Sequence, residues 1–222
     1  MSAEVASSPV SGLSPDLPRL NRPAPPFRAR TTQGVHSLAD YAGRWLVLFS
    51  HPADFTPVCT SEFITFARLA PRFAAIGCDL LGLSVDSLYA HLAWVRAIRE
   101  EFGVEIPFPI IEDVSMAISR AYGMLPEDAT DTSDVRATFV IDPAGLVRAL
   151  LYYPMDIGRD VGEVLRLVQA LQVADREAAA TPEGWRPGDP LIEPPPHSME
   201  EVDAAMARGG AWYYQLRPVK AS

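Results

Sequence analysis

Short hydrophobic runs separated by amphipathic stretches make up most of this 222-residue chain. A continuous apolar run bounded by glycine, proline or polar residues predicts a strand that is buried on both faces. The turn residues Asp142-Pro143-Ala144-Gly145 lie between the last two runs and predict a hairpin. The predicted strands cover residues 45–49, 79–85, 137–141 and 147–153.

Three amphipathic stretches between and after these runs predict helices, at about 60–73, 87–102 and 161–171. Pro71 predicts a kink near the end of the first helix. In the second helix, one face is predicted to carry Leu88, His91, Leu92, Val95 and Ile98. The alternation of strands and helices predicts an α/β protein with a largely parallel central sheet and helices on both faces.

The two ends of the chain differ from this middle part. Residues 1–16 are rich in Ser, Pro and Ala and are predicted to form a flexible N-terminal segment. After about Ala178 the chain becomes rich in proline, followed by a predicted short helix at 198–208. The aromatic residues Trp212-Tyr213-Tyr214 are expected to pack on the main domain or on another subunit. The predicted organisation is therefore a main domain at 17–175 and a C-terminal extension at 176–222.

Composition and charge exclude several classes of function. The formal net charge of −9 argues against nucleic-acid binding, and it gives an anionic membrane surface little to attract. The most apolar runs are far shorter than the roughly 20 residues of a membrane-spanning helix. The N-terminus has no basic start followed by an apolar run, so we expect a cytoplasmic protein. The two cysteines, Cys59 and Cys78, form no CxxC pair, which leaves reactive cysteine chemistry as the remaining functional role.

The surroundings of Cys59 favour such chemistry. The segment 50–63 joins a buried strand to an amphipathic helix, so Cys59 is predicted in the first helical turn, where the helix dipole favours a thiolate. Position alone is equally compatible with a buried, inert cysteine. Pro52 and Pro57 stiffen the loop, however, and the hydroxyl of Thr56 is suited to hydrogen-bond a peroxide oxygen.

The string from Phe49 to Thr60, FSHPADFTPVCT, contains the PxxxTxxC signature of the peroxiredoxins and closely resembles their peroxiredoxin six, or one-cysteine, class. The resemblance extends from about Leu17 to Pro218. It includes the segments LSVDS (83–87), IPFPII (106–111), VRATF (135–139) and YPMDIGR (153–159). It implies a thioredoxin-like fold, with a central mixed sheet flanked by helices and a C-terminal extension used for dimerisation or assembly.

The resemblance also implies a role for each residue of the site. Cys59 is similar to the peroxidatic cysteine, which attacks the O–O bond and becomes a sulfenic acid. Thr56 is similar to the threonine that hydrogen-bonds the peroxide, and Pro52 to the proline that shields the site. Arg136 matches the arginine that holds the thiolate and polarises the oxygens. The supporting residues implied in the same way are His51, Val58, Glu62 and Arg159.

Departures from the family pattern narrow the expected mechanism. Archaeal relatives carry two cysteines near the C-terminus, where this chain has Gly209 and Gln215. Cys78 is expected to be a small core residue. The expected partners are therefore a hydroperoxide and an external thiol reductant, with no cofactor and no metal. The assembly is expected to be a homodimer or a decameric or dodecameric ring. The segment Gly43-Arg44-Trp45 lacks the lipase-like serine of mammalian relatives, so phospholipase activity is not expected.

Three other functions compete with this interpretation. A thiol–disulfide oxidoreductase would need a second thiol beside Cys59. An oligomeric holdase or a peroxide sensor would need no turnover at all. Metal binding finds little support, because His36, His51, His91 and His197 show no ligand spacing.

Overall fold

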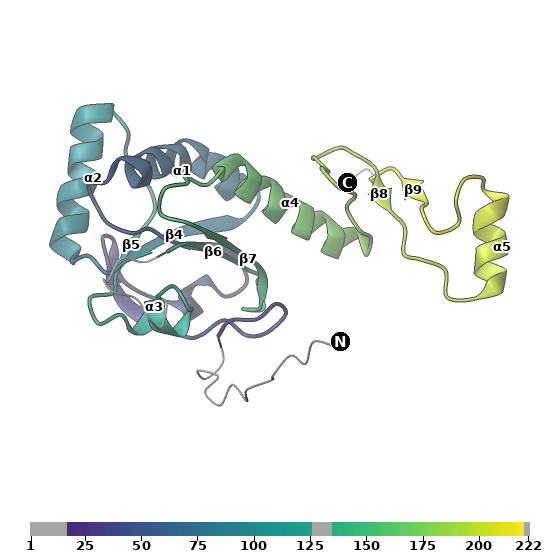
Figure 1. Ribbon diagram of the computed structural model, residues 1–222, viewed down its shortest axis with the longest axis horizontal. Coiled ribbons are helices and arrows are strands. Elements are labelled where there is room, and N and C mark those ends of the chain that lie inside the picture. Colours follow the sequence, from purple (N-terminus) through teal and green to yellow (C-terminus); the bar gives the residue numbers. More distant parts are fainter. Residues whose placement is uncertain (1–16, 126–134, 220–222) are drawn as a thin grey trace, which may run out of the picture.

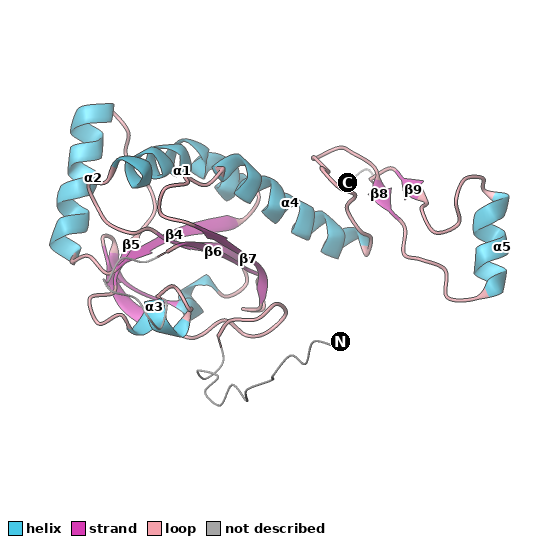
Figure 2. Ribbon diagram, in the orientation of Figure 1, coloured by secondary structure: helices cyan, strands magenta, loops and turns pink. Residues whose placement is uncertain are grey.

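A mixed sheet of seven strands forms the centre of the protein (Figures 1 and 2). The computed structural model describes residues 17–125 and 135–219, so the segment 1–16 that was predicted to be flexible lies outside the described residues. The strands follow the order β2-β1-β5-β4-β3-β6-β7. Their bounds are β1 (Arg28–Thr31), β2 (Gly34–Ser37), β3 (Trp45–Ser50), β4 (Cys78–Ser84), β5 (Ile110–Glu112), β6 (Arg136–Ile141) and β7 (Val147–Tyr153).

The prediction of a largely parallel sheet was wrong, whereas the mixed sheet implied by the family resemblance is confirmed. Only the β3–β4 and β4–β5 pairs are parallel, and the β6–β7 hairpin joins β3 in antiparallel register. An N-terminal hairpin of β1 and β2, which the hydrophobic pattern did not predict, adds to the other edge. Both additions are hairpins, and a hairpin necessarily contributes antiparallel strands.

Helices cover both faces of this sheet. Figure 1 shows α1 and α4 on one side and the short α3 on the other. Beyond α4, the C-terminal segment extends away from the sheet and holds a two-stranded sheet and one more helix. The bounds are η1 (Leu38–Tyr41), α1 (Pro57–Ala75), α2 (Leu88–Phe102), α3 (Ala117–Ala121), α4 (Val161–Glu177), β8 (Leu191–Ile192), α5 (Met199–Ala207) and β9 (Leu216–Arg217).

Two details of the helices differ from the prediction. Helix α1 begins at Pro57 rather than near Thr60, because Thr56 takes the extended N-cap conformation and proline is pre-organised for the first helical position. In α2 the buried face includes Trp94, whereas Leu92, predicted on that face, is 44% exposed. His91, Trp94 and Ile98 are spaced at i, i+3 and i+7, which defines a narrower stripe than the predicted one.

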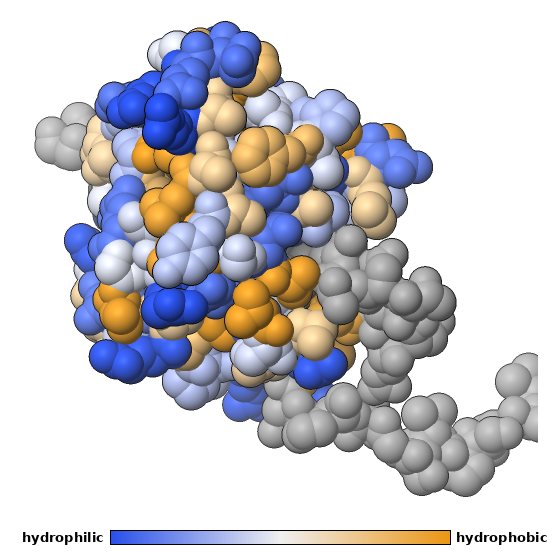
Figure 3. All heavy atoms as spheres, turned by 90° about the vertical axis from the view of Figure 1, so that its left-hand side faces the viewer, coloured by the Kyte–Doolittle hydropathy of each residue, from blue (hydrophilic) through white to orange (hydrophobic). Residues whose placement is uncertain are grey.

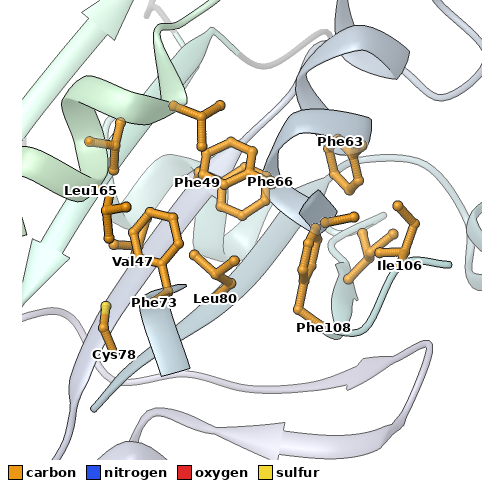
Figure 4. Packing of buried hydrophobic residues seen from close by; sticks show 14 of the residues in the cluster. Val47, Phe49, Phe63, Phe66, Phe73, Cys78, Leu80, Ile106, Phe108 and Leu165 are labelled. Carbon is orange, nitrogen blue, oxygen red and sulfur yellow. The ribbon is translucent and has the colours of Figure 1, made fainter. Parts of the chain in front are cut away.

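The core lies on both faces of β3. Alternate side chains of this strand enter two separate clusters: Trp45, Val47 and Phe49 face α1 and α4, and Leu46 and Leu48 face the opposite side. The Phe49 ring stacks on Phe66 of α1 at a centroid distance of 4.0 Å (Figure 4). This packing fixes α1 on the sheet at the carboxyl end of β3.

Replacing Phe66 by alanine tests how much this stack stabilises the fold. Phe66 is fully buried, so the Phe66→Ala variant should lose about 3–5 kcal/mol of unfolding free energy, because it loses buried apolar surface and leaves a cavity. Phe102→Ala is the matched control, since that ring is 56% exposed. Urea unfolding measures the unfolding free energy of both variants. Equal losses of unfolding free energy in the two would contradict the stabilising role of the Phe66 ring in the core.

Candidate active site

The thiol of Cys59 lies in the first turn of α1, as predicted. The chain leaves β3 at Ser50, passes through a loop and enters the helix at Pro57, so Cys59 is the third helical residue. Its side chain is fully buried. Phe55, in the loop, has a positive φ of 58°, a conformation that costs energy for a non-glycine residue and that turns the chain into the helix.

Thr56 and Pro52 hold this loop in shape. The Thr56 hydroxyl donates a hydrogen bond to the Ala53 carbonyl at 2.9 Å, which leaves the oxygen lone pairs of Thr56 as acceptors. The Thr56 carbonyl in turn accepts from the Thr60 hydroxyl at 2.8 Å. Pro52, a residue of the loop itself, is buried.

Arg136 approaches the sulfur from the sheet. It is the first residue of β6, and its Nη1 lies 3.3 Å from the Cys59 Sγ. The same Nη1 donates to the Glu62 carboxylate at 2.9 Å, while Nε donates to the Met155 carbonyl at 2.9 Å. The guanidinium is therefore held on two sides and is 3% exposed.

Glu62 joins Arg136 to a second buried arginine. Arg159 donates to Glu62 from its backbone N–H at 2.7 Å, from Nε at 2.9 Å and from Nη2 at 2.6 Å. Burial alone would raise the pKa of Glu62, but the hydrogen bonds and charge of Arg159, together with Arg136, outweigh it and hold that pKa below its ordinary value. Glu62 is thus the counter-ion of both arginines.

Val58 lies close to the loop that carries Arg159. A Cβ atom added to Gly158 would lie 3.4 Å from a Val58 methyl group, so the side chain of Val58 leaves little room at this position. The Arg159 guanidinium also lies over the rings of Phe49 and Phe66, with centroid distances of 5.4 and 5.8 Å. The arginine and the aromatic core therefore support each other.

His51 lies on the other side of the loop in a cluster that the sequence did not reveal. Its Nε2 is 2.8 Å from one oxygen of Asp54, and the Nδ1 of His91 is 2.8 Å from the other. Both imidazoles are fully buried, and the three side chains form a group of potential metal ligands. His91 comes from α2, so its spacing from His51 and Asp54 in the sequence gave no signal.

Cys78 is far from this site. It begins β4, opposite Trp45 at the start of β3, whereas Cys59 follows the other end of β3. The prediction that it is a small core residue is confirmed, because it is 3% exposed and belongs to the main hydrophobic cluster. Burial, with a further contribution from Asp79, raises the pKa of its thiol to about 12, so it is an unreactive thiol at neutral pH.

A buried cysteine at a helix start, touched by a fixed arginine at the end of a thioredoxin-like sheet, defines a thiol-dependent peroxidase. Comparisons with known proteins agree with this class. The AhpC/TSA family model matches residues 20–150, and the model of the C-terminal domain of 1-Cys peroxiredoxin matches residues 170–207. The chain belongs to the peroxiredoxin family.

Relatives cover most of the chain. Peroxiredoxin 2 of Caldanaerobacter subterraneus subsp. tengcongensis is 50% identical over 84% of each chain, and the peroxiredoxin of Aquifex aeolicus is 49% identical over 89% of this chain and 95% of its own. Among solved structures, a yeast mitochondrial 1-Cys peroxiredoxin is 40% identical with a TM-score of 0.78, over 91% of this chain and 99% of its own. A mutant of the peroxiredoxin 6 of Arenicola marina is 33% identical with a TM-score of 0.80, over 92% and 99%.

The Glu62 carboxylate gives a testable pH dependence of stability. Its pKa in the folded state lies below the ordinary value of 4.5, so its stabilising contribution is present above about pH 4.5 and is lost as the pH falls through the lower folded value. Glu62→Gln should lower the unfolding free energy at pH 7 by about 3–5 kcal/mol, because it removes the charge that balances two buried guanidinium groups. The substitution should also reduce the loss of unfolding free energy that the unaltered protein shows when the pH is lowered.

Denaturant unfolding at pH 7 and at pH 4 measures both effects. Glu105→Gln, at an exposed position, is the control and should change neither value by more than about 0.5 kcal/mol. An acid-induced loss of the same size in Glu62→Gln and in the unaltered protein would rule out this carboxylate as its source.

Proposed function

We propose that this peroxiredoxin reduces hydrogen peroxide and organic hydroperoxides through a sulfenic acid on Cys59, by a one-cysteine mechanism. The observation that carries the proposal is the contact between the Arg136 guanidinium and the Cys59 sulfur at 3.3 Å. Arg136 and Arg159 contribute two positive charges and Glu62 one negative charge, so the three groups together carry a charge of +1. A thiolate on Cys59 balances that charge, and a fixed guanidinium stabilises it without reorganisation.

The chemical step follows from this arrangement. The Cys59 thiolate attacks one oxygen of ROOH, the S–O bond forms, the O–O bond breaks, and RO⁻ leaves and takes a proton from water. Arg136 stabilises charge on the sulfur and on the departing oxygen. Thr56 offers its lone pairs to the peroxide hydroxyl, and Pro52 keeps water from the thiol. His51, Val58, Glu62 and Arg159 hold these groups in place.

The separation of the two cysteines supports the one-cysteine mechanism. From Cys59 to Ala75 helix α1 rises 1.5 Å per residue, or about 24 Å in all. A disulfide requires Cα atoms within about 7 Å of each other. Cys78 therefore has no access to Cys59 in the folded chain, and the sulfenic acid depends on an external thiol. The first thiol forms a mixed disulfide and releases water, and a second thiol releases Cys59 as a thiol.

The surface supports a homo-oligomer as the working form. Hydrophobic side chains interrupt the polar surface on the face that carries α2 (Figure 3). The exposed hydrophobic residues of α2 include Tyr89, Leu92 and Phe102. In the C-terminal extension Trp212, Tyr213 and Tyr214 are 39%, 69% and 50% exposed, so they remain available to a partner. We propose that residues 17–175 form the peroxidase domain and 176–222 the assembly extension of a homodimer or a decameric or dodecameric ring.

The cellular role that follows is antioxidant defence and redox homeostasis in the cytoplasm. None of the helices in the described ranges is long and apolar enough to cross a membrane. The yeast 1-Cys relative is described as being resolved via glutathione/thioredoxin systems, which supports a small or protein thiol as the reductant of this chain.

Graded peroxide treatment tests the mechanism. Cys59→Ser should abolish peroxide consumption, whereas Cys78→Ser should retain it, because only Cys59 contacts Arg136. Intact-mass analysis of the unaltered protein and of Cys78→Ser should show the same gain of oxygen atoms, up to the sulfinic acid at excess peroxide. An unmodified Cys59, or a Cys59–Cys78 disulfide at low dose, would exclude the proposed cycle.

Light scattering of the full chain tests the assembly. The unaltered protein should have the mass of a dimer or of a larger ring. A Tyr89→Asp, Leu92→Asp double variant should lower that mass, since it places two charges on the exposed hydrophobic face of α2. Arg96→Asp, at a polar position of the same helix, is the control. A monomeric unaltered protein would contradict the proposed assembly.

A further inference from the structure

Ser50 is the last residue of β3 and is fully buried. Its hydroxyl donates a hydrogen bond to the carbonyl of Val135, and the backbone N–H of Ala137 donates to the same hydroxyl oxygen at 3.1 Å. A serine hydroxyl offers one proton and two lone pairs, and a carbonyl can only accept, so the direction of both bonds is defined. The two bonded peptide groups flank Arg136, the residue whose guanidinium contacts the Cys59 sulfur.

The backbone ladder between β3 and β6 does not reach Arg136. It ends at the pair formed by Phe49 and Thr138. On the other side of β6, Arg136 pairs with Tyr153 of β7, which is the edge strand of the sheet. On the side of β3 the Ser50 hydroxyl supplies the hydrogen bonds at this end of the strand pair, so a side chain takes over where the backbone pairing stops.

Arg136 lies at the centre of a tight turn at the start of β6. The N–H of Ala137 donates to the Val135 carbonyl at 2.9 Å as well as to the Ser50 hydroxyl, which closes a three-residue turn around Arg136. Arg136 is not among the described non-glycine residues with a positive φ, so this is an inverse γ-turn, the form that is common at strand ends. The Val135 N–H donates to the Met124 carbonyl at 3.1 Å. The hydroxyl thus joins both peptide groups of the turn to β3.

The guanidinium end of Arg136 is fixed by other groups. Nε donates to the Met155 carbonyl and Nη1 to Glu62, each at 2.9 Å, and Nη1 lies 3.3 Å from the Cys59 sulfur. The side chain has a limited length, so a shift of the turn must lengthen one of these contacts or strain the side-chain torsions. A displacement of about 1 Å can cost a reaction about 100-fold in rate. The position of the backbone at Arg136 therefore matters to the chemistry at sulfur.

We propose that Ser50 is a positioning residue for the peroxidase reaction, and that its hydroxyl holds the turn at Arg136 so that the guanidinium meets the Cys59 sulfur. The inference rests on the proposed function, in which Arg136 stabilises charge on the sulfur and on the departing oxygen. Ser50 also begins the connection from β3 through the loop 51–56 to the helix that carries Cys59. The thiol and its arginine thereby share one anchor, the carboxyl end of β3.

Replacing Ser50 by alanine removes the hydroxyl and leaves the charged groups near the sulfur in the chain: Arg136, with Glu62 and Arg159 beyond it. The second-order rate constant of the reduced, full-length protein with hydrogen peroxide should fall by at least about tenfold, because the guanidinium is no longer held at the sulfur. Stopped-flow kinetics measures this rate constant.

The ionisation of Cys59 gives a second measurement, which needs no peroxide. In Ser50→Ala the thiol should ionise at higher pH than in the unaltered protein, since less positive charge acts on the sulfur. The ultraviolet absorbance of the thiolate follows this ionisation. A Cys78→Ser background leaves Cys59 as the only thiol of the chain.

A double-mutant cycle separates positioning from folding. In Arg136→Gln the guanidinium is removed, while Glu62 keeps Arg159 as its counter-ion. Because Ser50 is proposed to act through Arg136, adding Ser50→Ala to this variant should change the remaining peroxide rate by less than about twofold. A further loss of about tenfold in the double variant would mean that Ser50 acts by another route, and would overturn the proposal.

Ser119→Ala is the matched control. Ser119 is also a fully buried serine, and its hydroxyl donates to Asp113 at 2.8 Å. It belongs to α3, on the face of the sheet opposite α1 (Figure 1). This variant should leave the peroxide rate and the ionisation of Cys59 unchanged. Equal losses of rate in the two serine variants would reduce the role of Ser50 to folding and overturn the proposal.

The positioning role and the proposed function can fail separately. An unaltered protein that consumes no peroxide would refute the proposed function, and the ionisation of Cys59 would still test whether Ser50 holds the contact with Arg136. An unchanged rate and an unchanged ionisation in Ser50→Ala, in a protein that does consume peroxide, would overturn the positioning role alone.

Discussion

The active site depends on one buried carboxylate. Glu62 accepts hydrogen bonds from Arg136 and Arg159, and without it two guanidinium groups would lie unpaired in the protein interior. Because Glu62 and Cys59 are three positions apart in α1, they lie on the same side of the helix. The helix that presents the thiol therefore also presents the counter-ion of the arginine that touches the thiol. The position of Arg136 follows from this geometry rather than from its attraction to sulfur alone.

The fold provides this arrangement by bringing distant segments to one edge of the sheet. Arg136 opens β6, Arg159 follows β7, and α1 leaves the carboxyl end of β3, the strand to which β6 is paired. The stacked rings of Phe49 and Phe66 hold the helix against the sheet, and Arg159 lies over both of them. Stability and chemistry are thus coupled, because the aromatic core that fixes α1 also supports the charged cluster beneath Cys59.

The sequence predicted the parts of this site that depend on local order. Cys59 lies shortly after a buried hydrophobic run and at the start of a stretch with helical periodicity. This local pattern is enough to predict Cys59 in the first turn of a helix. The strand directions were harder to predict, because a hydrophobic run has the same appearance in parallel and antiparallel pairs. The pairing of Asp54 with His91 was beyond local reasoning altogether, since a contact across 37 positions leaves no periodic signal. The role of Arg136 came only from the family resemblance.

Two of the buried carboxylates differ in the groups that they contact. Asp54 lies 2.8 Å from the imidazoles of both His51 and His91, so it joins the loop after β3 to α2. Glu62 faces two guanidinium groups, so one positive charge remains, and the Cys59 sulfur lies 3.3 Å from one of these groups. In the proposed mechanism a thiolate on Cys59 balances this charge. The carboxylate that pairs two arginines in a dry interior thus leaves them one positive charge in excess, and a buried thiolate requires such a charge.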